Sequence, residues 1–419
     1  MKKKRGTRSG VALLALALAL SACGRSSDFK AGELGAVTVG AGEAIQIRSL
    51  QAATGPDSSL GIPQENAIRL AVEHHGPIAG HEVQVGPGFD ELCSEDGGQA
   101  ASDMIVADTQ IVGVIGTSCD AAASAAIPGI SDAGMVMISG SNTSPELTSD
   151  LTANPGSDHH PGYYRTAYND LTQGVAAARF VADHLGLASA GLIHNGDPKS
   201  RGLANAFEVE FTRLGGVITA NEAVVRGKVD MVPLLTGIAA TEPEAIFMPV
   251  IMAEATFLMQ QVGSVAGLED VVVVGADDLL VTDFLRLPES EGMYFIGPDL
   301  RVGDDTNTVT GRSADEVLAD YQVAYQQDPT SPFWTHAYDA TVVLLRAIES
   351  VGVVEGHVIH IDRQGLREET LKSNFDGITG RLTCDEFGDC SFARMMVVFH
   401  DDSTTIDATL QNVVYSYAP

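Results

Sequence analysis

Basic residues are scarce in this 419-residue chain, which has 25 Lys and Arg against 55 Asp and Glu and a formal net charge of −30. Five of the basic residues lie in the first eight positions, so the rest of the chain is more acidic still. A field of this sign repels nucleic acid and anionic lipid headgroups. We therefore expect no nucleic-acid partner.

The sequence also lacks the short motifs of common catalytic and cofactor sites. It contains no Gly-x-Ser-x-Gly elbow, no His-Glu-x-x-His motif and no phosphate-binding Gly-x4-Gly-Lys-Ser/Thr loop. Its three His pairs stand beside turn residues, and no Cys-x2-Cys spacing occurs. We predict a protein that is not an enzyme and that holds neither a metal nor a cofactor.

Apolar runs long enough to cross a membrane are absent from the sequence. The run Val11–Leu20 follows a basic start and precedes Ser21, Ala22 and Cys23. A basic start, a short apolar segment and small residues are typical of a secretory signal, and the Leu-Ser-Ala-Cys ending is similar to the lipobox of bacterial lipoproteins. We predict a signal peptide at 1–22 and a lipidated Cys23. An ordinary signal cleaved near Ala22 is the alternative.

Few cysteines remain once Cys23 is set aside as the lipid site. Four thiols in an oxidising compartment favour two disulfides. Cys384 and Cys390 flank a short turn, so a hairpin would bring them together locally. By elimination, Cys93 would then pair with Cys119.

Short apolar segments alternate with helical patterns along most of the chain. Predicted strands that are apolar nearly throughout include residues 111–115, 135–139, 190–194, 245–250 and 271–274. This alternation predicts an α/β fold with parallel sheets covered on both faces. One sheet of this length would be unusually wide, so we expect two doubly wound lobes. The small, polar residues 23–35 predict a flexible linker.

Polar turns follow three of the predicted strands, at residues 115–120, 139–146 and 274–278. The carboxyl ends of parallel strands are where open α/β sheets bind ligands. The first turn leads into an Ala-rich helix, so its amides and hydroxyls are suited to an anion such as a carboxylate. Helix capping is the alternative explanation for each Ser, Thr and Asp taken singly.

Several segments occur in an order and spacing that match a known family nearly from end to end. They are Thr54-Gly-Pro, Val114-Ile-Gly, Ser144-Pro-Glu-Leu, Arg165-Thr-Ala, Ser200-Arg-Gly-Leu-Ala, Val274-Gly-Ala-Asp and Gly380-x-Leu-Thr-x-Asp. With these segments the chain resembles the branched-chain amino-acid (leucine/isoleucine/valine) substrate-binding proteins of ABC transporters, which have the type I periplasmic binding fold. The resemblance implies lobes of residues 36–165 plus 298–396 and 166–297 plus 397–419, joined by three crossovers. It also supports the Cys93–Cys119 pairing.

The resemblance implies a ligand site formed by both lobes. The first lobe would contribute Ser118, Cys119, Asp120, Ser141, Asn142 and Thr143. The second would contribute Lys199, Ile251, Asp277 and Asp278. Asp277 falls where the family has an acidic residue that receives the α-ammonium of the ligand.

Three of these positions depart from the family pattern. Asp120 stands where the family commonly has a carboxylate-binding serine, and its charge would repel an anionic ligand. Lys199 replaces a tyrosine that usually covers the ligand, and Ile251 stands at a position that is often aromatic. The ligand is then either a zwitterion with its amine toward Asp120 and its carboxylate toward Lys199, or not an α-amino acid. A solvent-facing hinge role is the alternative for Lys199.

Together these features predict a monomeric, lipid-anchored, extracytoplasmic binding protein. It would deliver an amino acid or related small polar solute to an ABC permease by closing two lobes around it, without chemical reaction. Two alternatives stay open. One is a ligand sensor for a membrane kinase, and the other is a secreted hydrolase that uses carboxylates such as Asp120 and Asp277.

Overall fold

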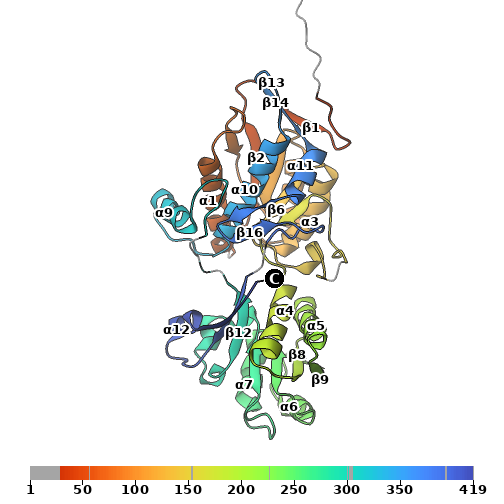
Figure 1. The fold of residues 1–419 in the computed structure, drawn as a ribbon, viewed down its shortest axis with the longest axis vertical. Coiled ribbons are helices and arrows are strands. Elements are labelled where there is room, and N and C mark those ends of the chain that lie inside the picture. Colours follow the sequence, from red (N-terminus) through yellow and green to blue (C-terminus); the bar gives the residue numbers. More distant parts are fainter. Residues whose placement is uncertain are drawn as a thin grey trace, which may run out of the picture. The chain divides into compact units, whose positions relative to one another are not determined.

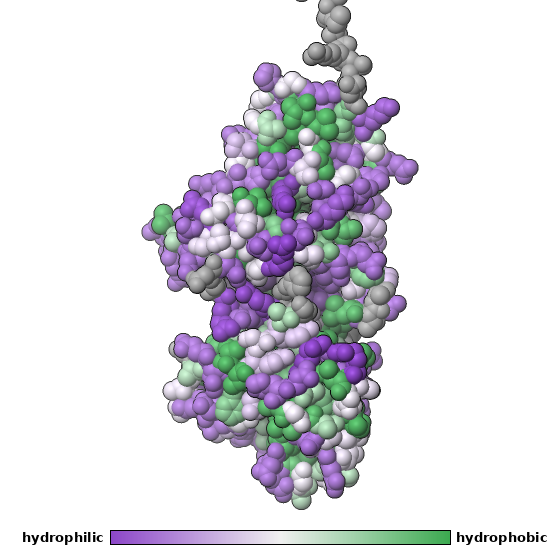
Figure 2. All heavy atoms as spheres, in the orientation of Figure 1, coloured by the Kyte–Doolittle hydropathy of each residue, from purple (hydrophilic) through white to green (hydrophobic). Residues whose placement is uncertain are grey.

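The computed structural model describes residues 29–418, apart from positions 56, 152–153, 226, 300, 302–304 and 392–393. The predicted signal peptide, Cys23 and the first part of the predicted linker lie outside the described residues. Within the described part of the chain, no helix has the length and apolar character needed to cross a membrane. Hydrophilic side chains predominate on the face shown in Figure 2, with smaller apolar patches between them.

The first sheet has six strands, in the order β3-β2-β5-β6-β7, with β4 pairing the end of β2. Figure 1 labels its strands β2 and β6. All of its pairings are parallel. Its strands are β2 Ile45–Gln51, β3 Val83–Val85, β4 Phe89–Asp90, β5 Ile111–Gly116, β6 Val136–Ser139 and β7 Tyr163–Arg165. Every residue of β5 and β6 is buried, as expected for strands covered on both faces.

Alternate residues of this sheet enter two different hydrophobic clusters. On one face, Ile115 and Ile138 belong to a cluster with residues of α1 (Ser58–His75) and α10 (Trp334–Val351). On the other face, Val114 and Met137 cluster with α2 (Glu95–Val106) and α3 (Asp120–Asp132). The period-two alternation of a strand therefore places a helical layer on each face.

The second sheet has seven strands, in the order β18-β17-β12-β11-β10-β8-β9. They are β8 Ser189–His194, β9 Val217–Ala223, β10 Ala245–Met248, β11 Val272–Gly275, β12 Tyr294–Pro298, β17 Met395–Phe399 and β18 Val413–Tyr417. The strands from β8 to β12 pair in parallel, whereas β17 and β18 pair antiparallel. The sheet is therefore mixed, and not wholly parallel as predicted. Antiparallel strands at the edge of a parallel sheet are common in such folds.

Helices also cover both faces of the second sheet. One cluster contains residues of α4 (Leu171–Arg179), η2 (Phe180–His184) and α5 (Pro198–Arg213). The other contains residues of α6 (Val232–Ala239), α7 (Met252–Val262) and α8 (Thr282–Leu285). The helix α4 continues directly into the π-helical turn η2, where the pattern of backbone hydrogen bonds changes.

Smaller elements complete the structure. They are β1 Ala36–Val39, β13 Val353–Glu355 and β14 Val358–Asp362 in a three-stranded sheet; the hairpin β15 Asn374–Gly377 and β16 Gly380–Thr383; and the helices η1 Pro145–Leu147, η3 Asp277–Leu279, η4 Pro288–Ser290, α9 Ala314–Tyr325, α11 Arg363–Leu371 and α12 Ile406–Gln411. Disulfides join Cys93 to Cys119 and Cys384 to Cys390, the same pairs as expected from the sequence.

Three connections link elements of the two sheets: the segment from β7 to α4, the segment after β12 that leads to α9, and the segment from β16 to β17. They agree in number with the three crossovers implied by the resemblance. The lobe boundaries themselves, 36–165 plus 298–396 and 166–297 plus 397–419, stay a prediction.

Candidate functional site

The loops after β5 and β6 use their hydroxyl groups within the protein. Ser118 is 3% exposed, and its hydroxyl donates to Gln51 Oε1 at 2.7 Å. The Ser141 hydroxyl donates to the Ser118 carbonyl at 2.9 Å and accepts from Gln64 Nε2 at 3.0 Å. These bonds fasten the two loops to each other and to the core. Any contact with a ligand at these positions would therefore fall mainly to backbone groups.

Two more predicted ligand residues face inward. Cys119 is bonded to Cys93, which ties the loop after β5 to the turn before α2. Asn142 is fully buried, and its Oδ1 accepts from the Thr117 hydroxyl at 3.1 Å and the Tyr163 hydroxyl at 3.0 Å. Both side chains are therefore used to hold the loops in place within the protein.

The Asp120 carboxylate accepts a hydrogen bond from a backbone amide of the loop after β6. Its Oδ1 accepts from the Thr143 N–H at 3.1 Å. The Thr143 hydroxyl donates to Asp170 Oδ2 at 3.1 Å, and the Asp170 N–H donates to the Thr143 carbonyl at 3.0 Å. The anion-binding turn predicted after β5 thus contributes a carboxylate of its own, and Thr143 bridges two aspartates.

The second sheet brings three further predicted residues together. Lys199 lies in the first turn of α5, and its Nζ is 3.4 Å from Asp277 Oδ1 and 3.2 Å from Asp278 Oδ2. Asp277 and Asp278 begin η3 directly after β11, and the Asp277 N–H donates to Gln173 Oε1 at 3.2 Å. Ile251 is half-buried immediately before α7.

The carboxylates from the two sheets interact with one another. Burial raises the pKa of Asp170 to about 7; Lys199 opposes the rise, whereas Asp277 and Asp120 add to it. Burial also raises the pKa of Tyr168 well above its ordinary value, and each of these three carboxylates and Asp278 contributes. We call Asp120, Asp170, Asp277 and Asp278 the acidic cluster.

The charges in this cluster are unevenly balanced. Burial raises the pKa of Asp120, against the lowering effect of the Arg165 guanidinium and of the Ser144 and Thr143 amides. Burial would lower the pKa of Lys199, but the neighbouring aspartates of the cluster outweigh it and raise that pKa. One ammonium group therefore faces several carboxylates, which leaves a negative potential at this place.

Glu91 is a buried carboxyl group that sequence reasoning missed. It is 0% exposed, and burial raises its pKa to about 8, although the Ser118 and Cys119 amides oppose the rise. The amides that were predicted to face a ligand anion thus lie next to a carboxyl group of the protein. Glu91 directly follows the short strand β4, and nothing in the local sequence indicates that it is buried, because its burial depends on long-range packing.

The family comparison agrees with this architecture. A family model described as periplasmic binding protein matches residues 44–393. The chain belongs to the periplasmic binding protein family. It is therefore an extracytoplasmic protein, as predicted.

Relatives of this periplasmic binding protein include amino-acid-binding proteins. The leucine-, isoleucine-, valine-, threonine-, and alanine-binding protein of Pseudomonas aeruginosa is 25% identical over 373 residues, which cover 87% of this chain and 92% of the relative. The predicted resemblance to branched-chain amino-acid-binding proteins is confirmed.

Solved structures share the fold at lower identity. The branched-chain amino acid transporter substrate binding protein of Streptococcus pneumoniae, in complex with isoleucine, has a TM-score of 0.60 and 20% identity, with 90% of this chain and 99% of that chain covered. A solute binding protein of Rhodopseudomonas palustris, in complex with 3,4-dihydroxy benzoic acid, has a TM-score of 0.59 and 19% identity, with 85% and 93% covered. The predicted fold class is confirmed, with the antiparallel strands as its correction.

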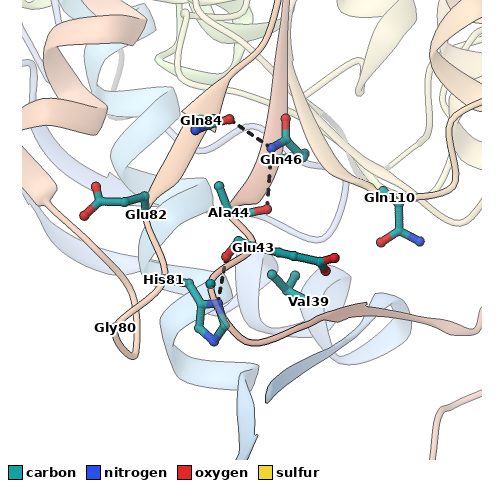
Figure 3. Close-up of a pocket in the computed structure, with 10 residues that line it drawn as sticks. Val39, Glu43, Ala44, Gln46, Gly80, His81, Glu82, Gln84 and Gln110 are labelled. Carbon is teal, nitrogen blue, oxygen red and sulfur yellow. Dashed lines mark hydrogen bonds between the residues drawn. The ribbon is translucent and has the colours of Figure 1, made fainter. Parts of the chain in front are cut away.

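A separate cavity of about 580 Å³ lies at the amino-terminal ends of strands in the first sheet. Its lining comes from the starts of β2 and β3 and from the segment before β5. Figure 3 shows Glu43 and His81 on neighbouring segments, with the His81 ring bonded to the Glu43 carbonyl and Gln46 Nε2 donating to Gln84 Oε1. The candidate ligand residues follow the carboxyl ends of the strands, so this cavity is not part of their site.

Besides Glu91, three residues at the site were not predicted: Asp170, Gln173 and Arg165, all near the first connection between the sheets. Its place close to the predicted lobe boundary between residues 165 and 166 was the one sequence signal available for Asp170. Arg165 belongs to one of the segments that carry the resemblance. Its contacts with the Asn142 and Ser144 carbonyl groups depend on the fold.

Proposed function

We propose that this protein is the solute-binding component of an ABC transporter and that its ligand is an amino acid or related small solute that presents an ammonium group. The names of its relatives support the transport role and the amino-acid class. A lipid anchor at Cys23, an ABC permease partner and a monomeric state belong to the same proposal.

The observation that carries the ligand class is the hydrogen bond from the Thr143 N–H to the Asp120 carboxylate. A ligand carboxylate at this place would compete with a carboxylate that the protein already supplies. An ammonium group would instead gain from Asp120 and from the rest of the acidic cluster, even with Asp170 protonated. The site is therefore best matched by positive charge on this side.

Lys199 is the proposed partner of a ligand carboxylate. Its ammonium group is paired with Asp277 and Asp278, and its side chain is 37% exposed, so it is accessible to a solute. A ligand carboxylate could join this pair in place of water. An amino acid would then bind with its amine toward Asp120 and its carboxylate toward Lys199.

The protein would act through the difference in affinity between its open and closed states, and the ligand would leave unchanged. Recovery of intact ligand after long incubation is expected, whereas turnover would favour the hydrolase alternative. Permease and ATPase genes beside this gene would favour transport, and a histidine kinase gene would favour sensing.

The ligand class is tested by mass spectrometry of any compound released from the purified protein, followed by thermal shifts with amino acids, amines and carboxylates. A ligand at about 100 times its Kd stabilises the folded state by about 2.7 kcal/mol, which is easily measured. Compounds with an ammonium group should shift the Tm. Shifts with benzoate or acetate, and none with amines or amino acids, would overturn the proposed ligand class.

A further inference from the structure

Arg165 is a fully buried cation at the end of β7. Its Nε lies 2.5 Å from Asp389 Oδ1, and its Nη2 donates to the Thr148 hydroxyl at 2.5 Å. Thr148 in turn donates to Asp389 Oδ2 at 3.1 Å, and Asn169 Nδ2 donates to the same oxygen at 3.2 Å. A guanidinium removed from water needs such a set of partners, because an unpaired buried charge is strongly unfavourable.

The partner carboxylate comes from a distant part of the chain, inside the loop that the Cys384–Cys390 disulfide closes. Backbone bonds hold this loop against β7: the Arg165 N–H donates to the Gly388 carbonyl at 2.9 Å, and the Cys390 N–H donates to the Arg165 carbonyl at 2.8 Å. A Cβ at Gly388 would lie 2.4 Å from the Tyr163 carbonyl oxygen. Glycine is thus required for this close approach.

The remaining donors of Arg165 reach the loop that carries Thr143. Nη1 donates to the Ser144 carbonyl at 2.7 Å and to the Asn142 carbonyl at 3.3 Å. The peptide units of this loop are planar, so fixing their carbonyl groups also fixes the direction of the amide groups on the other side. The Thr143 amide faces Asp120. Arg165 therefore holds one side of the loop and Asp120 the other.

We infer that the Arg165–Asp389 pair is a positioning device that couples two of the connections between the sheets to the loop of residues 142–144. Arg165 is the last residue of β7, directly before the connection to α4, and Asp389 lies in the connection that leads to β17. A change in either connection is transmitted to the amides that contact Asp120. For its effect on ligand affinity, the inference rests on the proposed function.

The chain offers a matched control for the loss of a buried carboxylate. Asp339 is fully buried on α10, and it accepts from Asn307 Nδ2 and from the Ile378 and Thr379 N–H groups. None of these partners belongs to the loop of residues 142–144. Asp339→Asn removes a buried charge of the same kind and should destabilise the protein without affecting that loop.

Amide hydrogen exchange of the full chain tests the inference without a ligand. In Asp389→Asn, peptides covering residues 141–147 should exchange at least about tenfold faster than in the parent, and Asp389→Glu should restore part of the protection. Asp339→Asn should leave these peptides unchanged. If Asp389→Asn fails to fold, Thr148→Val, which removes only the bridging hydroxyl, should give the same local effect.

Binding of L-lysine, measured by titration calorimetry on the same variants, separates this inference from the proposed function. Weaker binding to Asp389→Asn but not to Asp339→Asn supports both. If L-lysine binds none of the variants, the ligand class is in doubt, and the exchange data alone decide the inference. Unchanged exchange at residues 141–147 in Asp389→Asn and Thr148→Val overturns it.

Discussion

The Asp120 carboxylate accepts the Thr143 N–H at 3.1 Å, so a side chain from the start of α3 occupies a backbone amide of the loop after β6. Each group comes from a turn at the carboxyl end of a parallel strand. The backbone amide of Thr143, in a turn expected to contact a ligand, thus donates to a carboxylate of the protein itself. The side chain that a ligand would meet here is negatively charged.

Replacing Asp120 by serine should shift the ligand preference toward carboxylates. The change frees the Thr143 amide and removes a negative charge, and a charge-assisted hydrogen bond of this kind contributes about 1.5–3 kcal/mol. We expect weaker binding of amines and stronger binding of acids in a thermal-shift panel. Asp132→Ser, an exposed change at the far end of α3, is the control. An unchanged preference would count against the role of Asp120.

Replacing Lys199 by alanine should weaken binding of amino acids about tenfold, because it removes the partner proposed for the ligand carboxylate. Binding of simple amines should be retained or strengthened, since Asp277 and Asp278 lose their competing ammonium. Calorimetric titration measures both effects. Lys372→Ala, at an exposed lysine paired with Glu369, is the control. Equal affinities in parent and variant would instead support a solvent-facing role for Lys199.

Glu91 should make the protein less stable as the pH rises. Burial raises its pKa from 4.5 in the unfolded chain to about 8 in the folded state, so the folded protein holds this proton more tightly. Its contribution to stability is therefore present below about pH 4.5 and lost as the pH approaches 8.

Glu91→Gln should then become more stable relative to the parent between pH 5 and pH 8, by roughly 1–4 kcal/mol in urea denaturation. The comparison with the parent cancels the titration of histidines. The exposed Glu82→Gln should show no such trend. A constant difference across this pH range would mean that Glu91 is ionised in the folded state.

Removing the Cys93–Cys119 disulfide with two serine substitutions should cost about 3.5 kcal/mol, because the bond closes a loop with a sequence separation of 26 residues. Removing Cys384–Cys390, with a separation of 6, should cost about 2 kcal/mol. Urea denaturation under non-reducing conditions measures both. The first change should also loosen the segment that carries Asp120, and hydrogen exchange there would reveal it.

Cys23→Ser should release the protein from the membrane. Attachment of two or more acyl chains gives stable anchoring, whereas a protein without them has no such hold. Cell fractionation and metabolic labelling with palmitate are expected to show a soluble, unlabelled variant. Persistent membrane association without label would point to an anchor other than Cys23.

The predicted strands of nearly continuous apolar character are all present in the structure. The predicted segments at residues 111–115, 135–139, 190–194 and 245–250 correspond to β5, β6, β8 and β10. The strand β1 was missed because it is short, and it forms by pairing with β14 more than 300 positions away. Local patterns carry little information about such antiparallel pairs.

Some residues of the candidate site could be predicted from the sequence and others could not. Asp120, Thr143, Lys199, Asp277 and Asp278 stood out because they follow strand ends or match family positions, and the structure brings Asp120 to Thr143 and Lys199 to both aspartates. Asp170, Glu91 and Arg165 were missed as site residues, because each acquires its role through burial against a distant segment.

The α/β class, the family, the acidic composition and the polar turns after the strands could all be read from the sequence, because they depend on local periodicity, composition and the order of motifs. Which groups of those turns point inward became clear from the folded structure alone. The direction of a backbone amide and the burial of a carboxyl group depend on packing between segments that are remote in the chain. That packing placed Asp120 on Thr143 and Asp389 on Arg165.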